Sequence, residues 1–540
     1  MSAISVRRPF LSWPILLLPA LSLSIGWGIR GNFGHEHGAM IPGALAAMAV
    51  VLAIDRPDWH RRVAFFGMFG AIGWSFGGSM SYGHVIAYTH SGDPPNILYG
   101  FAALWLIGFL WGALGGAGTA LPAYLSRERL TEFLPPLLWF FAVLAIHDLT
   151  YDGLNAWLAA RGLGVSYGDP AMRHEEALYW FDTDWTTALI AVVVPLVYRL
   201  VRRRSDEATG LMLHLAIGWW IGFLLFPVLL DWRMTPPRGD NWAGCLGMAV
   251  GAAVFFQRRG LPGITHAMLV GGFMGGIGFS LATAIKLLWI RTGWTANWHS
   301  VMEQTYGLIN GLGIGLAMAF AARHAPEVTD QPPLRRWADW FAPAFVALFV
   351  TYINARKNPE EWIKAEAIAP ALYWFSTITW FNIGSAAIAA TFLWIMVRHL
   401  KRPVPLIPSS WAGKGQALFL GTLAASVAMN FERAIVAFAE QRLITEGVIL
   451  INACWTTVLV VLWTGAHAVD PPAVAEPNWK PPLGRRCLLG GVAGVLCCLF
   501  ALATTLLAFG ARPAEGGTPR YRFGGPTSQA STPAPGQAHP

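Results

Sequence analysis

The stretch YGFAALWLIGFLWGAL, residues 99–114, contains no charged residue and lies within a longer apolar run over residues 98–124. About twenty consecutive apolar residues are enough for an α-helix to cross the hydrocarbon core of a bilayer. Similar runs recur along the whole chain of 540 residues, of which 55% are hydrophobic and 13% are charged. Soluble domains carry about 25% charged residues. The sequence therefore predicts an all-α, polytopic integral membrane protein.

About fifteen spans are expected, and the first is predicted to be a retained helix and not a cleaved signal peptide. Lys and Arg gather in alternate loops, which predicts a cytoplasmic N-terminus and, with an odd number of spans, a C-terminus outside. The predicted location is the cell (cytoplasmic or inner) membrane. Because most of the net charge of +8 lies in these short loops, it does not indicate a nucleic-acid partner. The expected spans are residues 10–29, 39–54, 63–82, 98–124, 132–149, 183–200, 210–230, 241–256, 264–290, 303–322, 337–353, 371–397, 414–431, 446–464 and 487–509.

The opening stretch has a counterpart later in the chain: YGLINGLGIGLAMAFA, residues 306–321, aligns with it at an offset of 207 residues (306 minus 99). Four further pairs match in the same order and at similar offsets, which predicts two parallel six-helix repeats. The predicted units are residues 1–205, residues 206–405, a three-helix segment over residues 406–510 and a disordered tail over residues 511–540. The four pairs are RGNFGHEHGAM (30–40) with RGDNWAGCLGM (238–248), GMFGAIGWS (67–75) with GFMGGIGFS (272–280), FAVLAIHDLTYDG (141–153) with FVALFVTYINARK (345–357), and LYWFDTDW (178–185) with LYWFSTITW (372–380).

Two six-helix repeats with a cytoplasmic N-terminus are similar in plan to the major facilitator transporters. The loop DRPDWHRR, residues 55–62, also resembles the acidic and basic cytoplasmic loop of that family. It lacks the glycines of the family's pattern, and the predicted number of helices differs. The resemblance is therefore one of plan and not of membership.

Glycines recur at four-residue spacing in the third and fourth helices of each predicted repeat, for example at Gly108 and Gly112 and at Gly307, Gly311 and Gly315. Small residues at this spacing let helix backbones approach closely in lipid. Two interpretations stay open at this point: static close packing, or smooth surfaces along which helices move during alternating access.

Titratable residues gather on the predicted outer side of the first repeat. Apart from His539 in the tail, seven histidines fall on this side and six of them belong to the first repeat. In the second repeat Ala243 aligns with His35 and Cys245 aligns with His37. We therefore expect the first repeat to carry the coupling chemistry. The seven are His35, His37, His84, His90, His147, His174 and His299.

The segment RGNFGHEHGAM, residues 30–40, has three interpretations. It is a solvated turn, or a metal site in which His35 and His37 combine with His84, His90 or His147, or a charge and proton site beside a cavity. In the third case a buried Arg30 needs a partner, for which Glu36 and Asp148 are the candidates. His147 and Asp148 are either an interfacial helix cap or an acid/base pair, and Glu303 is a candidate partner of Lys286. The candidate residues for substrate or ion coupling are Arg30, His35, Glu36, His37, His84, His147, Asp148, Arg238, Asp240 and Glu303.

The leading functional hypothesis is a secondary transporter, coupled to ions or protons, that moves a small polar solute. The alternative is an integral membrane enzyme, a transferase using a lipid-linked donor, with its active site at the outer leaflet. A structural or assembly subunit is the third possibility. The sequence contains no Walker A motif and no nucleophile motif that assigns a catalytic residue. It also lacks the HExxH and HxxEH patterns of common metal sites, so the metal interpretation is not the favoured one and no cofactor is predicted. Expected partners are membrane lipids and a small solute or coupling ion, with no nucleic acid, and the pattern does not fix an oligomeric state.

Overall fold

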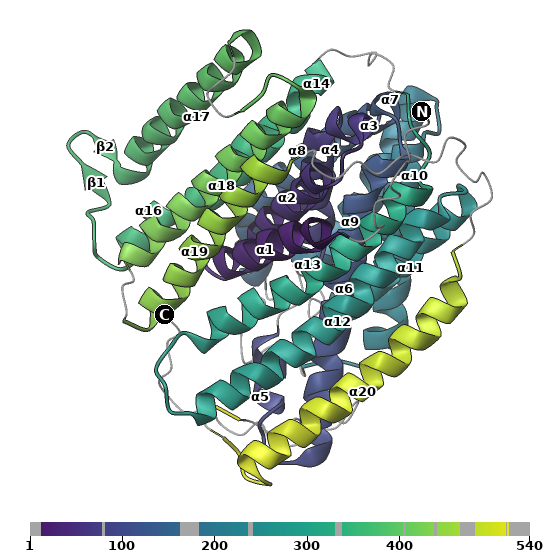
Figure 1. The fold of residues 1–540 in the computed structure, drawn as a ribbon, viewed down its shortest axis with the longest axis vertical. Helices are drawn as coiled ribbons and strands as arrows, with labels where there is room; N and C mark the ends of the chain where they lie inside the picture. The colour runs from purple at the N-terminus through teal and green to yellow at the C-terminus, as the bar shows by residue number, and fades with distance from the viewer. Residues whose placement is uncertain are drawn as a thin grey trace, which may run out of the picture.

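The structure, a computed structural model, describes residues 12–77, 82–161, 183–235, 241–329, 337–402, 407–436, 440–464, 481–514 and 516–517. Nearly all of these residues lie in helices that run side by side, with α17 and α20 at opposite edges of the bundle (Figure 1). The strands in the described ranges are a two-residue pair, β1 (Ala371–Leu372) and β2 (Phe375–Ser376), which pair antiparallel. The all-α prediction is therefore confirmed for the described part of the chain.

The helices follow the order of the predicted spans, with short additional helices in several connections. The first are α1 (Trp13–Arg30), α2 (Glu36–Ala53), α3 (Pro57–His60), α4 (Val63–Ser75), α5 (Gly83–Tyr88), α6 (Pro94–Tyr124), α7 (Arg127–Thr131), α8 (Leu134–Ala159) and α9 (Thr183–Arg202). Next are α10 (Glu207–Phe223), the π-helical turn η1 (Leu224–Leu229), α11 (Asn241–Arg258), α12 (Pro262–Arg291), α13 (Trp298–His324), α14 (Trp337–Ala344), the π-helical turn η2 (Phe345–Phe349), α15 (Val350–Ala355), α16 (Lys357–Lys364) and α17 (Thr377–Lys401). The last are α18 (Trp411–Val436), α19 (Glu440–Trp463) and α20 (Leu483–Phe509).

Thirteen helical segments in the described ranges are long and apolar enough to cross a membrane, which supports a multi-pass membrane protein. The expected count of fifteen is not confirmed, because α4 and α11 are not among the thirteen. The particular membrane and the side on which each terminus lies stay predictions. The terms outer and cytoplasmic below refer to the predicted orientation.

The third expected span, residues 63–82, is shorter than predicted. The helix α4 ends at Ser75 after 13 residues, and the chain turns at Phe76 and Gly77. A helix of this length rises about 20 Å, whereas a bilayer core is about 30 Å thick. The helix therefore stops short of the outer side, and Tyr82 lies just before α5.

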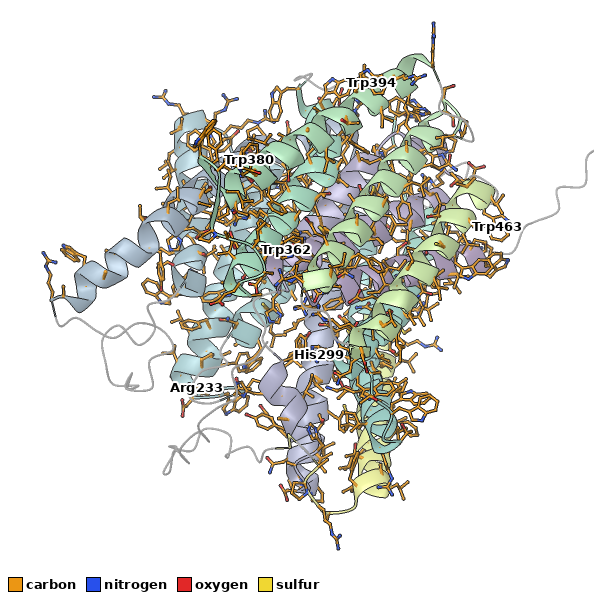
Figure 2. The ribbon with its side chains drawn as sticks, turned by 90° about the vertical axis from the view of Figure 1, so that its left-hand side faces the viewer. Arg233, His299, Trp362, Trp380, Trp394 and Trp463 are labelled. Carbon is orange, nitrogen blue, oxygen red and sulfur yellow. The ribbon has the colours of Figure 1, made fainter. Side chains whose placement is uncertain are left out.

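The centre of the bundle is α2, which buries every residue from Gly38 to Ala53. A helix that is apolar on all faces is expected to be surrounded by other helices. In contrast, α17 has no buried residue in its most apolar window. Its Trp380 and Trp394 are 40% and 59% exposed, as expected of a helix that faces lipid (Figure 2).

Two close helix pairs join the predicted repeats. On α13, Cβ atoms at Gly307, Gly311 and Gly315 would lie 2.5 Å from backbone atoms of α1. On α6, Gly108 and Gly112 face the backbone of α12 at similarly close range. The glycine ridges therefore form close helix contacts in the structure. Whether these helices also move along each other stays a prediction.

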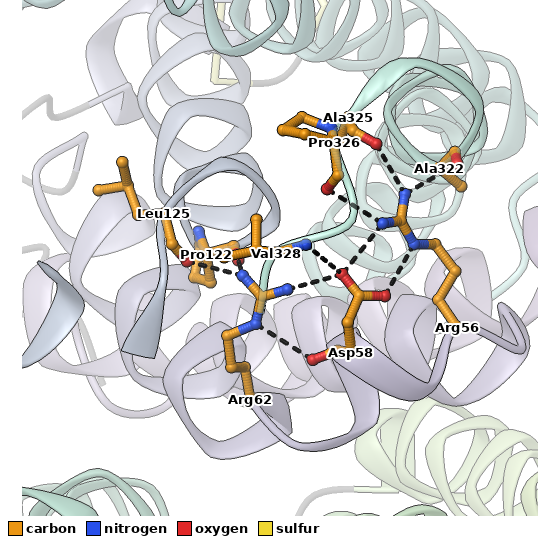
Figure 3. A network of polar contacts seen from close by, with 9 residues as sticks. All are labelled: Arg56, Asp58, Arg62, Pro122, Leu125, Ala322, Ala325, Pro326 and Val328. Carbon is orange, nitrogen blue, oxygen red and sulfur yellow. Dashed lines mark hydrogen bonds and ion pairs between the residues drawn. The ribbon is translucent and has the colours of Figure 1, made fainter. Parts of the chain in front are cut away.

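The cytoplasmic ends of several helices are held by a buried network around Asp58 of α3 (Figure 3). The Asp58 carboxylate accepts hydrogen bonds from Arg56 Nε at 2.9 Å and from Arg62 Nη2 at 2.8 Å. All three side chains are at most 2% exposed. The two guanidinium groups also donate to backbone carbonyls near the C-terminal ends of α13 and α6, so they satisfy acceptors that helix ends leave open. The carbonyls belong to Ala322, Ala325 and Pro326 for Arg56, and to Pro122 and Leu125 for Arg62.

Candidate functional site

A buried ion pair joins the outer ends of α1 and α13. Arg30, the last residue of α1, is 1% exposed, and its Nη1 lies 2.9 Å from Oε1 of Glu303. Nη1 also donates a hydrogen bond of 2.7 Å to the hydroxyl of Tyr82, which in turn donates to the Glu303 carboxylate. Residue 30 belongs to the first predicted repeat and residue 303 to the second. The break after α4 brings Tyr82 to this pair.

Aromatic rings enclose the Arg30 guanidinium. Its Cζ lies 4.9 Å from the ring centroid of Trp27 and 4.7 Å from that of Trp111. Such contacts replace part of the hydration that a buried cation loses. The Nε atom of Arg30 is buried, and no residue in the described ranges accepts a hydrogen bond from it.

Two histidines contact the pair from the outer side. His299, one turn before Glu303 on α13, has a side chain 47% exposed, and its Nε2 lies 3.7 Å from Oε1 of Glu303 (labelled in Figure 2). Its ring stacks on Tyr82 with centroids 5.8 Å apart. His35 is exposed, and its Nδ1 contacts Nη2 of Arg30. We call Arg30, Tyr82, Glu303, His35 and His299 the Arg30 centre.

Two groups of this centre lie outside the membrane-spanning segments and have shifted pKa values. Surrounding protein and the adjacent positive charge of Arg30 lower the pKa of His35 to about 3, although part of its surface is exposed. The imidazole is therefore neutral at neutral pH. Burial raises the pKa of Tyr82, so its hydroxyl keeps its proton and can donate it to Glu303.

A second basic group acts on this centre. Lys286 of α12 lies within electrostatic reach of Glu303, as predicted for this residue, but the direct ion pair of Glu303 is with Arg30. With Arg30, Lys286 gives the centre two basic groups beside a single carboxylate. Farther out, the opposite charges of Glu36 and Lys357 act on each other.

The segment after Arg30 is held by helices from the second half of the chain. Lys357 Nζ donates a hydrogen bond of 2.5 Å to the Phe33 carbonyl. Asn32 donates to Asn430 Oδ1 at 2.7 Å and accepts from Arg442 Nη2 at 3.0 Å. The C-terminal helices α18 and α19 thus support the outer loop that carries His35.

These C-terminal helices also bury a second carboxylate near the loop. Glu446 of α19 is 5% exposed and accepts a hydrogen bond from Asn430 of α18. Asn430 in turn accepts from Asn32, so one chain of hydrogen bonds connects the outer loop to Glu446.

The structure brings together three of the predicted site residues: Arg30, His35 and Glu303. The expectation that Glu36 or Asp148 would pair with Arg30 is wrong, because α13 crosses α1 at the level where Arg30 ends its helix and presents Glu303 there. Glu36 is exposed and does not contact Arg30 in the described ranges. The backbone carbonyl of His37 accepts from Asn354 at 3.0 Å.

The other predicted site residues lie apart from the Arg30 centre or outside the described residues. His84 is exposed on α5. His147 of α8 contacts Asp148 at 3.0 Å and Thr186 of α9 at 2.7 Å. These contacts link α8 to α9 and do not involve the Arg30 centre. Arg238, Asp240 and His174 lie outside the described residues.

No group of three His, Cys, Asp or Glu side chains in the described ranges is arranged to hold a metal ion. The metal interpretation of His35 and His37 therefore gains no support from the structure. The chain matches no protein-family model, no curated protein and no solved structure.

Several residues of this region were not among the predicted site residues. Tyr82 stood at the end of an expected span, and the glycine-rich sequence before it was the only signal of a helix break. Trp27 and Trp111 resemble the many other tryptophans of the chain in sequence. Asn430 and Glu446 lie in helices that were assigned no role, although a buried Asn and Glu in apolar helices are typical of functional positions.

Proposed function

We propose that the protein is a secondary transporter that moves a small polar solute and couples this movement to an ion or proton gradient. Its coupling site is the Arg30 centre, with Glu303 as the carboxylate that exchanges the coupling ion. The observation that carries the proposal is the buried Arg30–Glu303 pair, 2.9 Å apart and in contact with the half-exposed His299.

A pair of this kind is poor evidence for a purely structural role. Removing two charges from water costs several kcal/mol per ion, and apolar replacements are often at least as stable. Ionisable residues inside membrane segments usually mark ion pathways and proton relays. The contact between His299 and Glu303 provides a route for a proton or cation between the outer solution and the buried carboxylate.

The backbone around the centre supports the same function. The helix α4 ends early at Ser75, and Tyr82, which precedes α5, contacts the ion pair. Interrupted helices commonly form the binding sites of secondary transporters. The pair also joins helices of the two predicted repeats. A relative movement of α1 and α13 would therefore alter the distance between Arg30 and Glu303.

The test is ion entry into proteoliposomes driven by added solute. The full chain is reconstituted with a trapped pH-sensitive or Na⁺-sensitive dye, and succinate, gluconate, glucose, sucrose, choline and betaine are added separately. Empty liposomes give the proton or Na⁺ entry that each solute causes without the protein. We expect at least one solute to cause proton or Na⁺ entry, and Glu303→Gln to abolish it because the amide cannot exchange a proton or neutralise a cation.

The matched control is Glu361→Gln, which changes an outer carboxylate that is 43% exposed and 3.7 Å from Arg433. This variant should retain ion entry. The proposal fails if no solute causes ion entry, or if Glu303→Gln transports like the wild type.

A further inference from the structure

One edge of the Arg30 guanidinium has no carboxylate partner in the structure. Glu303 and Tyr82 both bind through Nη1, so the pairing with Glu303 uses one nitrogen only. On the opposite edge, Nη2 contacts the single ring nitrogen of His35, and Nε has no acceptor in the described ranges. This Nε–Nη2 edge presents two parallel N–H groups, which is the geometry that binds a carboxylate through both oxygens.

The charges of the centre also favour an anionic ligand. Arg30 and Lys286 are both basic, and the same carboxylate, Glu303, acts on each of them. A buried positive charge in excess is costly, so an additional carboxylate would complete the compensation. A cationic ligand would instead increase the excess.

The position of His35 gives the ligand an entry. This residue lies just before α2, is exposed, and contacts Nη2 of that edge with a neutral ring that adds no compensating charge. An anion arriving from the outer side would displace the ring and exchange one neutral acceptor for two charged ones. The faces of Trp27 and Trp111 beside the guanidinium would contact the apolar part of the ligand.

We propose that the solute is a small carboxylate that binds the Nε–Nη2 edge of Arg30 in place of His35. This inference rests on the proposed transport function, because it names the class of solute that the same site carries. His35 then acts as a competitor for the ligand position, so its removal should tighten binding, which a purely structural role of His35 does not predict.

The test measures binding by the purified full chain through its thermal unfolding. The probes are acetate, lactate, succinate and benzoate, each compared with its own amide at equal ionic strength. We expect at least one carboxylate to raise the unfolding temperature while its amide does not. Arg30→Lys keeps the charge but removes the two-nitrogen edge, so it should weaken the apparent affinity about tenfold or more.

Two further variants separate binding from general effects. His35→Ala changes an exposed side chain and should bind the same carboxylate more tightly than the wild type. Arg291→Gln removes another outer positive charge from α12 and should leave the affinity unchanged. The proposal is overturned if no carboxylate binds, if an amide binds equally well, if Arg30→Lys binds like the wild type, or if His35→Ala binds more weakly.

Failure of this inference can be told apart from failure of the transport function. If glucose or choline causes ion entry that depends on Glu303, while carboxylates do not bind, the transporter stands and the carboxylate is wrong. If a carboxylate binds in an Arg30-dependent way but no gradient drives its uptake, the binding site stands and the transport function is wrong.

Discussion

The substitution Asp58→Asn tests whether the buried network at the cytoplasmic side holds the helix ends together. Asp58 is the carboxylate shared by Arg56 and Arg62, whose side chains are fully buried. Arginine stays charged at all accessible pH values, so neutralising Asp58 removes the carboxylate that the two buried guanidinium groups share. Breaking one side of a buried ion pair costs about 3–5 kcal/mol. Asparagine has nearly the same size as aspartate, so the loss of stability measures the effect of removing the charge.

The assay is thermal unfolding of the purified full chain in detergent, with all variants heated at one rate because membrane proteins often unfold irreversibly. The control is Glu132→Gln, which breaks an exposed pair with Arg204 at 3.3 Å, where the side chains are 31% and 67% exposed. A surface pair contributes about 1 kcal/mol or less. We expect Asp58→Asn to lower the unfolding temperature several times as much as Glu132→Gln does. Equal shifts would refute the reasoning.

Two further predictions follow from the packing and from the outer loop. Gly112→Ala should destabilise the protein by about 1–3 kcal/mol, because the added methyl group would clash with the carbonyl oxygen of Gly271. The control Gly384→Ala has open space around the added methyl group and should stabilise the protein by up to about 1 kcal/mol. Thermal unfolding of both variants checks this prediction, and equal effects would contradict it. The pKa of His35 is about 3 in the folded protein and about 6.5 when unfolded, so only the unfolded state takes up a proton between these values and stability falls as the pH drops through that window. His35→Gln should therefore lose less stability than the wild type between about pH 7 and about pH 4.5 in thermal unfolding. Identical losses in the two proteins would show that His35 does not contribute.

Much of the fold could be predicted from the sequence because apolar length is a local property. Thirteen of the expected spans correspond to helices long and apolar enough to cross a membrane. The two exceptions, α4 and α11, also have local causes, but α4 is too short to qualify whereas α11 is not apolar enough. The residues after Ser75 remain apolar enough to extend a hydropathy window, yet the helix ends there and the chain turns at Phe76 and Gly77. In contrast, α11 forms a full helix, but Asn241 and Arg258 at its ends reduce its apolar character.

The candidate site was predicted only in part. The segment around Arg30 and the residue Glu303 both stood out, because charged groups between or within apolar segments are rare. Their pairing could not be predicted, since 273 positions separate them and the contact depends on how α13 crosses α1. The carboxylates Glu36 and Asp148 were preferred because they fall, like Arg30, on the predicted outer side of the first repeat. The supporting roles of Asn430 and Arg442 depend on the packing of the last helices in the same way.

The most direct test of the central claim compares Glu303→Gln with the double variant Arg30→Gln, Glu303→Gln for solute-driven ion entry into proteoliposomes. Removing both members of a buried pair leaves no uncompensated charge within it, so the double variant should be more stable than Glu303→Gln alone. If the pair is the coupling site, the double variant should be folded but show no solute-dependent ion entry. Ion entry at the wild-type rate in the double variant would show that the pair only stabilises the fold and would contradict the proposed function.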